Sequence, residues 1–173
     1  NDARRQRQMC IRDSIKPNKI INLNDIFTNI KSNFEIILKK KSINLHLDLM
    51  KPTLVFGDND KLLTVFSNLI DNSIKYSQNG KNIYVNSQNS EGKLIDKNIV
   101  ISIKDEGVGI PQQLIPRITE RFFRVDEEKS KKAGGTGLGL AIMKHIISQH
   151  RGDYEILSKV DKGTEVKIYL PTK

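Results

Sequence analysis

The stretch Asp105-Glu106-Gly107-Val108-Gly109-Ile110-Pro111 places an acidic residue and two glycines directly after a short apolar run, residues 99–103. A second glycine-rich stretch, Gly135-Thr136-Gly137-Leu138-Gly139-Leu140, opens a helix predicted over residues 138–150. Glycine lets the backbone approach a ligand closely. The free N–H groups and the dipole at the start of a helix favour phosphate. Together the two stretches indicate a site for a phosphate-bearing ligand.

A helix predicted over residues 58–76 lies between these motifs and the N-terminus, with Asp58 as its N-cap. One face of this helix is predicted to be buried, and it carries Leu62, Phe66, Leu69 and Ser73. An adjacent stripe at helical spacing is polar, and it carries Asn68, Asn72, Lys75 and Tyr76. Amides and a lysine beside two glycine motifs favour a nucleotide site.

The remaining pattern predicts helices and strands in alternating groups. We expect a helix over residues 25–41, strands over 43–49, 54–56, 81–87 and 98–105, and a closing hairpin of 154–158 with 164–170. A polar turn is expected over residues 89–97. This order predicts an α+β fold, a two-layer sandwich in which about three helices cover one face of a mixed, mostly antiparallel sheet.

Composition limits the possible functions of the 173 residues. Cys10 is the single cysteine, so the chain has neither an intrachain disulfide nor a cysteine zinc cluster. The formal net charge is +9, but the aromatic content of 6% offers little surface for stacking bases. We therefore expect no nucleic-acid partner. No apolar run is long enough to cross a bilayer, and the charged start without Met suggests a fragment.

Four motifs in order closely resemble the ATP-binding catalytic domain of sensor histidine kinases, which has the Bergerat fold. Residues 68–77 resemble the asparagine box of that family, and residues 105–111 its first glycine box. Residues 120–126 resemble its phenylalanine box, and residues 135–140 its second glycine box. The resemblance implies the cofactors ATP and Mg²⁺ and a mobile ATP lid over residues 112–134.

The resemblance also implies roles at the phosphate end of the site. Asn72 corresponds to the asparagine that binds Mg²⁺, and Asn68 to the other asparagine of the same box. Lys75 corresponds to a lysine that contacts phosphate, and Arg124 to a lid cation near the γ-phosphate. Asn68, Lys75 and Arg124 are thus the expected catalytic residues. The expected phosphate cradle and lid hinge consist of Gly135, Thr136, Gly137, Leu138 and Gly139.

At the base end, Asp105 corresponds to the acid that accepts a hydrogen bond from the adenine amino group. Tyr76 is expected to pack beside the base, and Thr164 to reach it with its hydroxyl through a water. The backbone that passes close to the base is expected to carry Gly107, Gly109 and Ile110.

The chain departs from the family pattern in three places. Thr119 stands where the family often has Phe, which predicts looser docking of the lid, and Ser73 replaces a common Ala. No segment resembles the phosphorylated histidine motif, and we interpret His46, His145 and His150 as surface or partly packed residues. Residues 1–16 are expected to be the remnant of a dimerisation-domain helix or linker, and residues 17–173 the catalytic kinase domain.

The expected function is therefore transfer of the ATP γ-phosphoryl group to a histidine in two-component signalling. The expected partners are a histidine-bearing dimerisation domain of the same kinase and a response regulator. The fragment is expected to be monomeric and cytoplasmic, and the full protein a homodimer anchored in the inner or plasma membrane.

Two alternatives stay open at this point. One is an ATP-hydrolysing conformational clamp of the same superfamily, related to gyrase, chaperone and mismatch-repair ATPases. Those enzymes have a Glu base where Asn68 stands, which argues against this alternative. The other is a serine-kinase-like regulator that binds a protein partner.

Overall fold

The computed structural model describes residues 19–90, 98–125 and 136–172. Its main sheet has five strands in the order β2-β4-β5-β7-β6. The central pairs β4–β5, β5–β7 and β7–β6 are antiparallel, and the edge strand β2 is parallel to β4. The strand bounds are Asn44–Asp48 (β2), Asn82–Ser90 (β4), Asn98–Asp105 (β5), Asp153–Lys159 (β6) and Gly163–Pro171 (β7).

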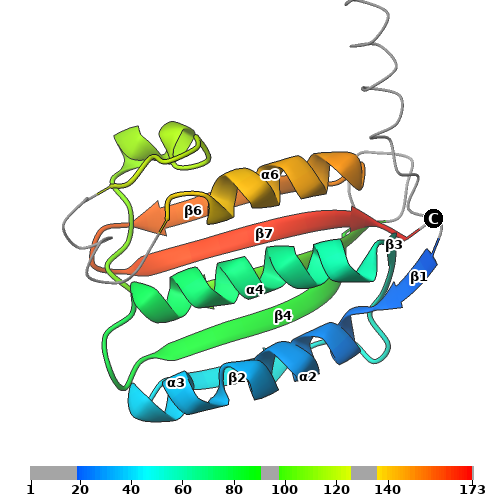
Figure 1. Ribbon diagram of the computed structural model, residues 1–173, viewed down its shortest axis with the longest axis horizontal. Coiled ribbons are helices and arrows are strands. Elements are labelled where there is room, and N and C mark those ends of the chain that lie inside the picture. The colour runs from blue at the N-terminus through cyan, green and yellow to red at the C-terminus, as the bar shows by residue number, and fades with distance from the viewer. Residues whose placement is uncertain (1–18, 91–97, 126–135, 173) are drawn as a thin grey trace, which may run out of the picture.

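Helices cover one face of this sheet, as Figure 1 shows. Their bounds are Leu23–Asn33 (α2), Glu35–Lys40 (α3), Asn59–Lys75 (α4) and Gly139–Gln149 (α6). A 3-10 helix, η1 (Gln112–Arg117), contacts β6, and a separate two-stranded sheet pairs β1 (Lys19–Asn22) with β3 (Leu54–Gly57). The predicted α+β two-layer sandwich with a mostly antiparallel sheet is confirmed. Among the described helices, none has the length and apolar character that a membrane span requires.

The core lies between the helices and the sheet. On α4 the predicted face is buried, from Leu62 through Phe66 and Leu69 to Ser73. Opposite this face, β5 contributes Ile101 and Ile103, which are at most 1% exposed. Because α4 packs its apolar stripe onto the central strands, the neighbouring polar stripe is held beside the strand ends that carry Asp105.

Asp58 caps α4 as predicted, since its side chain accepts a hydrogen bond from the backbone N–H of Lys61 at 2.9 Å. The bounds of β5 and the closing hairpin also agree with the sequence pattern. The predicted turn over residues 89–97 begins later, because β4 continues to Ser90, and residues 91–97 lie outside the described residues. Residues 1–16 also lie outside them, so their assignment to a preceding helix stays a prediction.

The prediction of a single helix over residues 25–41 was wrong. The chain forms two helices that meet at Phe34, whose φ of −94° and ψ of 4° leave the helical region. The break redirects the second helix so that Leu38 is buried at 6% exposure, while Ile37 is 36% exposed. Beyond the break Leu38 is therefore the core residue rather than Ile37, which the apolar spacing along residues 26–37 did not reveal.

The prediction for His150 was also wrong, because this side chain is fully buried rather than at the surface or partly packed. Its Nε2 accepts a hydrogen bond from the backbone N–H of Asp58 at 3.0 Å, and its Nδ1 lies 2.8 Å from the carbonyl oxygen of Ile146. Because that carbonyl can only accept, Nδ1 carries the proton and donates. The neutral ring thereby joins the end of α6 to the start of α4.

We expect His150→Ala to lower the free energy of unfolding by about 2–4 kcal/mol, because it leaves the N–H of Asp58 without its partner and opens a cavity. Denaturant unfolding monitored by circular dichroism measures this change. His145→Ala is the matched control on the same helix. Because the His145 side chain is exposed, this substitution should lower the free energy of unfolding by under about 0.5 kcal/mol. Equal losses in the two variants would contradict the structural role of His150.

Candidate functional site

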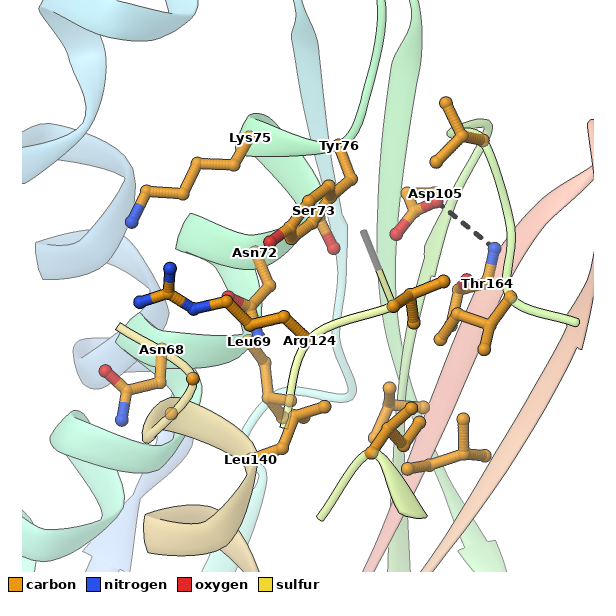
Figure 2. Close-up of a pocket in the computed structure, with 18 of the residues that line it drawn as sticks. Asn68, Leu69, Asn72, Ser73, Lys75, Tyr76, Asp105, Arg124, Leu140 and Thr164 are labelled. Atoms are coloured by element: carbon orange, nitrogen blue, oxygen red, sulfur yellow. Dashed lines mark hydrogen bonds between the residues drawn. The ribbon is translucent and has the colours of Figure 1, made fainter. Parts of the chain in front are cut away.

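A cavity of about 580 Å³ lies between α4, the start of α6 and the ends of the central strands (Figure 2). It brings together most of the site residues predicted from the sequence. They are Asn68, Asn72, Lys75, Tyr76, Asp105, Gly109, Ile110, Arg124, Thr136, Gly137, Leu138, Gly139 and Thr164. Gly107 does not line the cavity, but its N–H donates a hydrogen bond to Asp105, which does. Gly135 lies outside the described residues.

The polar stripe of α4 forms one wall of the cavity. Asn68 and Asn72 lie one turn apart on this wall, and in Figure 2 Asn68 lies further from Asp105 than Asn72 does. The ammonium group of Lys75 forms an ion pair with the carboxylate of Asp71 at 2.7 Å. An incoming anion would therefore share the Lys75 charge with Asp71.

Asp105 ends β5 and is only 7% exposed. Its Oδ1 accepts hydrogen bonds from the backbone N–H of Gly107 at 2.9 Å and of Thr164 at 3.1 Å. Burial raises the pKa of this carboxyl above its usual value, although these hydrogen bonds act in the opposite direction. A buried acceptor therefore lies at one end of the cavity.

The first glycine box depends on a close backbone contact. Gly109 has a φ of +72°, and a Cβ atom there would lie 2.1 Å from the carbonyl oxygen of Lys159. No other residue fits this position without moving the loop away from the β6–β7 hairpin. Ile110 follows, and its N–H donates to Ser158 Oγ at 2.8 Å.

The start of α6 faces the amides of α4. Among the residues that the structure describes, no side chain caps the first turn of α6, whose N-cap residue is Leu138. A Cβ atom added to Gly139 would lie 3.6 Å from Cβ of Asn68 and 3.8 Å from Nδ2 of Asn72. Uncapped N–H groups and the positive end of a helix dipole thus border the amide stripe, an arrangement that suits an anion.

The described part of the predicted lid is attached to the second glycine box. The N–H of Phe122 donates to the carbonyl oxygen of Gly137 at 2.9 Å. Gly137 has a φ of +73°, and a Cβ atom there would lie 2.9 Å from Cα of Phe122, so a side chain would separate the two segments. In Figure 2 the side chain of Arg124 extends toward Asn68 and Asn72.

Sequence reasoning did not identify the apolar part of the lining. This group comes from four elements and the turn that follows η1, and includes Leu69, Ile118, Leu140, Ile156 and Val166. Helical spacing or strand alternation marks apolar side chains as inward-facing, but neither pattern distinguishes a cavity wall from solid core. Sequence reasoning also missed Ser158, which contacts both the glycine box and Thr164.

The comparisons with known proteins agree with this geometry. Residues 57–173 match the family described as histidine kinase-, DNA gyrase B- and HSP90-like ATPases. The chain therefore belongs to this family of ATPases.

The relatives within this family are sensor histidine kinases. The sensor-like histidine kinase SenX3 of Mycolicibacterium smegmatis is 33% identical over 151 residues, which is 87% of this chain and 38% of SenX3. The sensor histidine kinase WalK of Bacillus subtilis is 42% identical over 117 residues, which is 67% of this chain and 18% of WalK. The chain thus spans less than two fifths of the length of either relative.

A solved structure has the same fold. The mycobacterial sensor histidine kinase MprB superposes with a TM-score of 0.72 at 27% identity. The match covers 90% of this chain and 97% of the MprB chain.

The raised pKa of Asp105 predicts how base binding depends on pH. The ionised carboxylate accepts a hydrogen bond from an amino group better than the neutral acid does. We therefore expect adenosine affinity to fall as the pH drops through the Asp105 pKa, beginning at a higher pH than for an ordinary aspartate. Adenosine carries no phosphate whose titration would obscure the effect. Titration followed by NMR across a pH series measures it.

Asp105→Asn is the control for this titration. Its Oδ1 can still accept from Gly107 and Thr164, so the fold should survive. The amide nitrogen would present a donor to the donor group of adenine, and affinity should fall about tenfold to a hundredfold. The remaining binding should lose its dependence on acidic pH. A titration curve that is the same in both proteins would remove Asp105 from the base site.

Proposed function

We propose that this chain is the ATP-binding catalytic domain of a sensor histidine kinase and transfers the γ-phosphoryl group of ATP to a protein histidine. The observation that carries the proposal is the pairing of two features within one cavity. A buried carboxylate, Asp105, lies at one end, and the uncapped start of α6 faces the amides of α4 at the other. The acid suits an amino-bearing base, and the helix start suits phosphates.

Adenine would bind at the end that contains Asp105. The carboxylate would accept a hydrogen bond from the amino group, whereas the oxo group of guanine would meet a second acceptor. Apolar side chains such as Leu69 and Val166 line the cavity and suit the faces of the ring. Tyr76, Gly109 and Ile110 complete the lining at this end in the proposal.

The phosphates would bind where the start of α6 faces Asn68 and Asn72. Backbone N–H groups near Gly137 and Gly139 would donate to phosphate oxygens, with Thr136 and Leu138 in the same stretch. Lys75 and Arg124 both line the cavity and would offset negative charge as the phosphoryl group leaves.

Mg²⁺ fits the donor set only together with a nucleotide. Within the described residues no cluster of three His, Cys, Asp or Glu side chains is suited to a metal ion. Mg²⁺ commonly keeps several waters and uses one or two protein oxygens with substrate phosphates. The amide oxygen of Asn72 is the proposed protein ligand, and the bound ion would neutralise charge on the phosphates.

The phosphoryl acceptor would come from a separate histidine-bearing dimerisation domain. A neutral imidazole is already a nucleophile, so its lone pair attacks phosphorus while ADP leaves. No strong base is required in the cavity, and the uncharged amide of Asn68 is consistent with this chemistry. A response regulator, a cytoplasmic location, a membrane-anchored homodimer and a monomeric fragment stay predictions of the same resemblance.

Asn72→Ala should separate metal and phosphate binding from base binding. Removing the amide oxygen should weaken binding of ATP with Mg²⁺ roughly tenfold, because one ligand of the ion is lost. Adenosine should bind within about twofold of the unchanged protein, because Asn72 lies on α4 whereas Asp105 lies at the end of β5. Calorimetry with ATP, ADP and adenosine, with and without Mg²⁺, measures both effects. Equal losses for adenosine and Mg-ATP would mean that the substitution only disturbed α4.

Phosphoryl transfer is the direct test of the proposal. The chain should be mixed with the histidine-bearing dimerisation domain, labelled ATP and Mg²⁺, and the product tested for an acid-labile phosphohistidine. We expect label on the added domain, and a loss of at least about tenfold with Asn72→Ala. ATP hydrolysis without any transfer would instead favour a clamp-type ATPase.

A further inference from the structure

Ser158 lies behind the cavity, on the edge strand β6, and is 9% exposed. Its Oγ has three partners. The N–H of Ile110 lies 2.8 Å away, the carbonyl oxygen of Gly163 3.0 Å away and Oγ1 of Thr164 2.8 Å away. Thr164 is the residue directly opposite Ser158 in the β6–β7 ladder, and unlike Ser158 it lines the cavity.

The direction of these hydrogen bonds follows from the capacity of a hydroxyl group, which has one proton and two lone pairs. The carbonyl of Gly163 can only accept, so the Ser158 proton points to it. The N–H of Ile110 can only donate, so it occupies one lone pair of Ser158. The second lone pair is left for Thr164, whose hydroxyl must therefore donate to Ser158.

The consequence concerns what Thr164 offers a ligand. Its single proton is directed at Ser158, away from the cavity, so its oxygen has only lone pairs left for any other partner. Asp105 is an acceptor at the same end of the cavity, and its Oδ1 accepts from the N–H of Thr164 (Figure 2). The base end therefore presents two acceptors side by side.

We propose that Ser158 is a positioning residue that makes the Thr164 hydroxyl an obligatory acceptor and so sets the preference of the cavity for a 6-amino over a 6-oxo purine. This inference rests on the proposed function, because it assigns the base to this end of the cavity. A 6-amino group can donate to Asp105 and, directly or through one water, to Thr164. A 6-oxo group would meet acceptors only.

Ser158 also has a purely structural role that the test must separate from the proposal. It holds the first glycine box through Ile110, and its carbonyl oxygen accepts from the side chain of Gln112. If Ser158 acted only as this anchor, its loss would shift the loop and weaken the binding of every purine nucleoside by a similar factor. The relative affinities of different nucleosides therefore distinguish the two roles.

The experiment compares adenosine, purine riboside and inosine, which carry an amino group, a hydrogen and an oxo group at position 6. Ser158→Ala frees the Thr164 proton to turn into the cavity. The adenosine-to-inosine affinity ratio should fall roughly threefold to tenfold. The affinity for inosine should also rise relative to the affinity for purine riboside. Ser158→Thr keeps the hydroxyl and should preserve the ratios of the unchanged protein. NMR titration measures all three affinities.

Ser87→Ala is the matched control, because Ser87 forms a similar buried hydroxyl pair away from the cavity. Its Oγ accepts from the N–H of Met50 at 2.8 Å and lies 2.9 Å from Oγ1 of Thr53. This variant should leave the nucleoside ratios unchanged. The ratios are the readout, because a general loss of stability moves all three affinities together.

Thr164→Val provides a second test that does not require Ser158→Ala to fold. Removing the hydroxyl should lower the adenosine-to-inosine ratio by a similar factor, and adding Ser158→Ala should change it no further. An unchanged ratio in Thr164→Val, or equal losses for all nucleosides in Ser158→Ala, would overturn the inference. If the unchanged protein binds no adenosine, the proposed function fails instead.

Discussion

The burial of the Asp105 carboxylate at the end of β5 is the constraint on which the rest of the site depends. A charged group that is 7% exposed is costly in free energy unless hydrogen-bond donors surround it. Its donors are the backbone N–H groups of Gly107 in the following loop and of Thr164 on β7. Because the loop and β7 must both converge on one side chain, this carboxylate sets the positions of the glycine box and the closing hairpin relative to one another.

Helix α4 connects this constraint to the core and to the other end of the cavity. Its buried face, which includes Phe66, packs on the sheet, while Asn72 and its neighbours line the cavity. The helix α6 runs antiparallel beside it. At one end His150 accepts a hydrogen bond from Asp58, and at the other Gly139 faces Asn72. The hydrogen bond between His150 and Asp58 thus joins the two helices at one end, and the uncapped start of α6 borders the cavity at the other end.

Local sequence patterns were sufficient to predict elements whose apolar residues recur with one regular period. The α4 face, its Asp58 cap and the bounds of β5 could be predicted in this way. The break at Phe34 could not be predicted, because the apolar spacing continues through it although Leu38 is buried and Ile37 is exposed. Ser158 could not be found either, since its contact with Ile110 spans 48 residues and a small polar residue on an edge strand resembles a solvated one. The individual site roles came from the family resemblance.

The two ends of the cavity differ in how firmly they are held. At the proposed base end, Asp105, Ser158 and Thr164 are linked to one another or to backbone groups through hydrogen bonds between neighbouring strands of one sheet. At the phosphate end, the expected contacts come from a helix start and from long side chains, Lys75 and Arg124, which lose rotamer entropy when a ligand orders them. Lys75 must also share its charge with Asp71. The proposed base end is therefore preorganised, whereas the proposed phosphate end would adjust to the charge on its ligand.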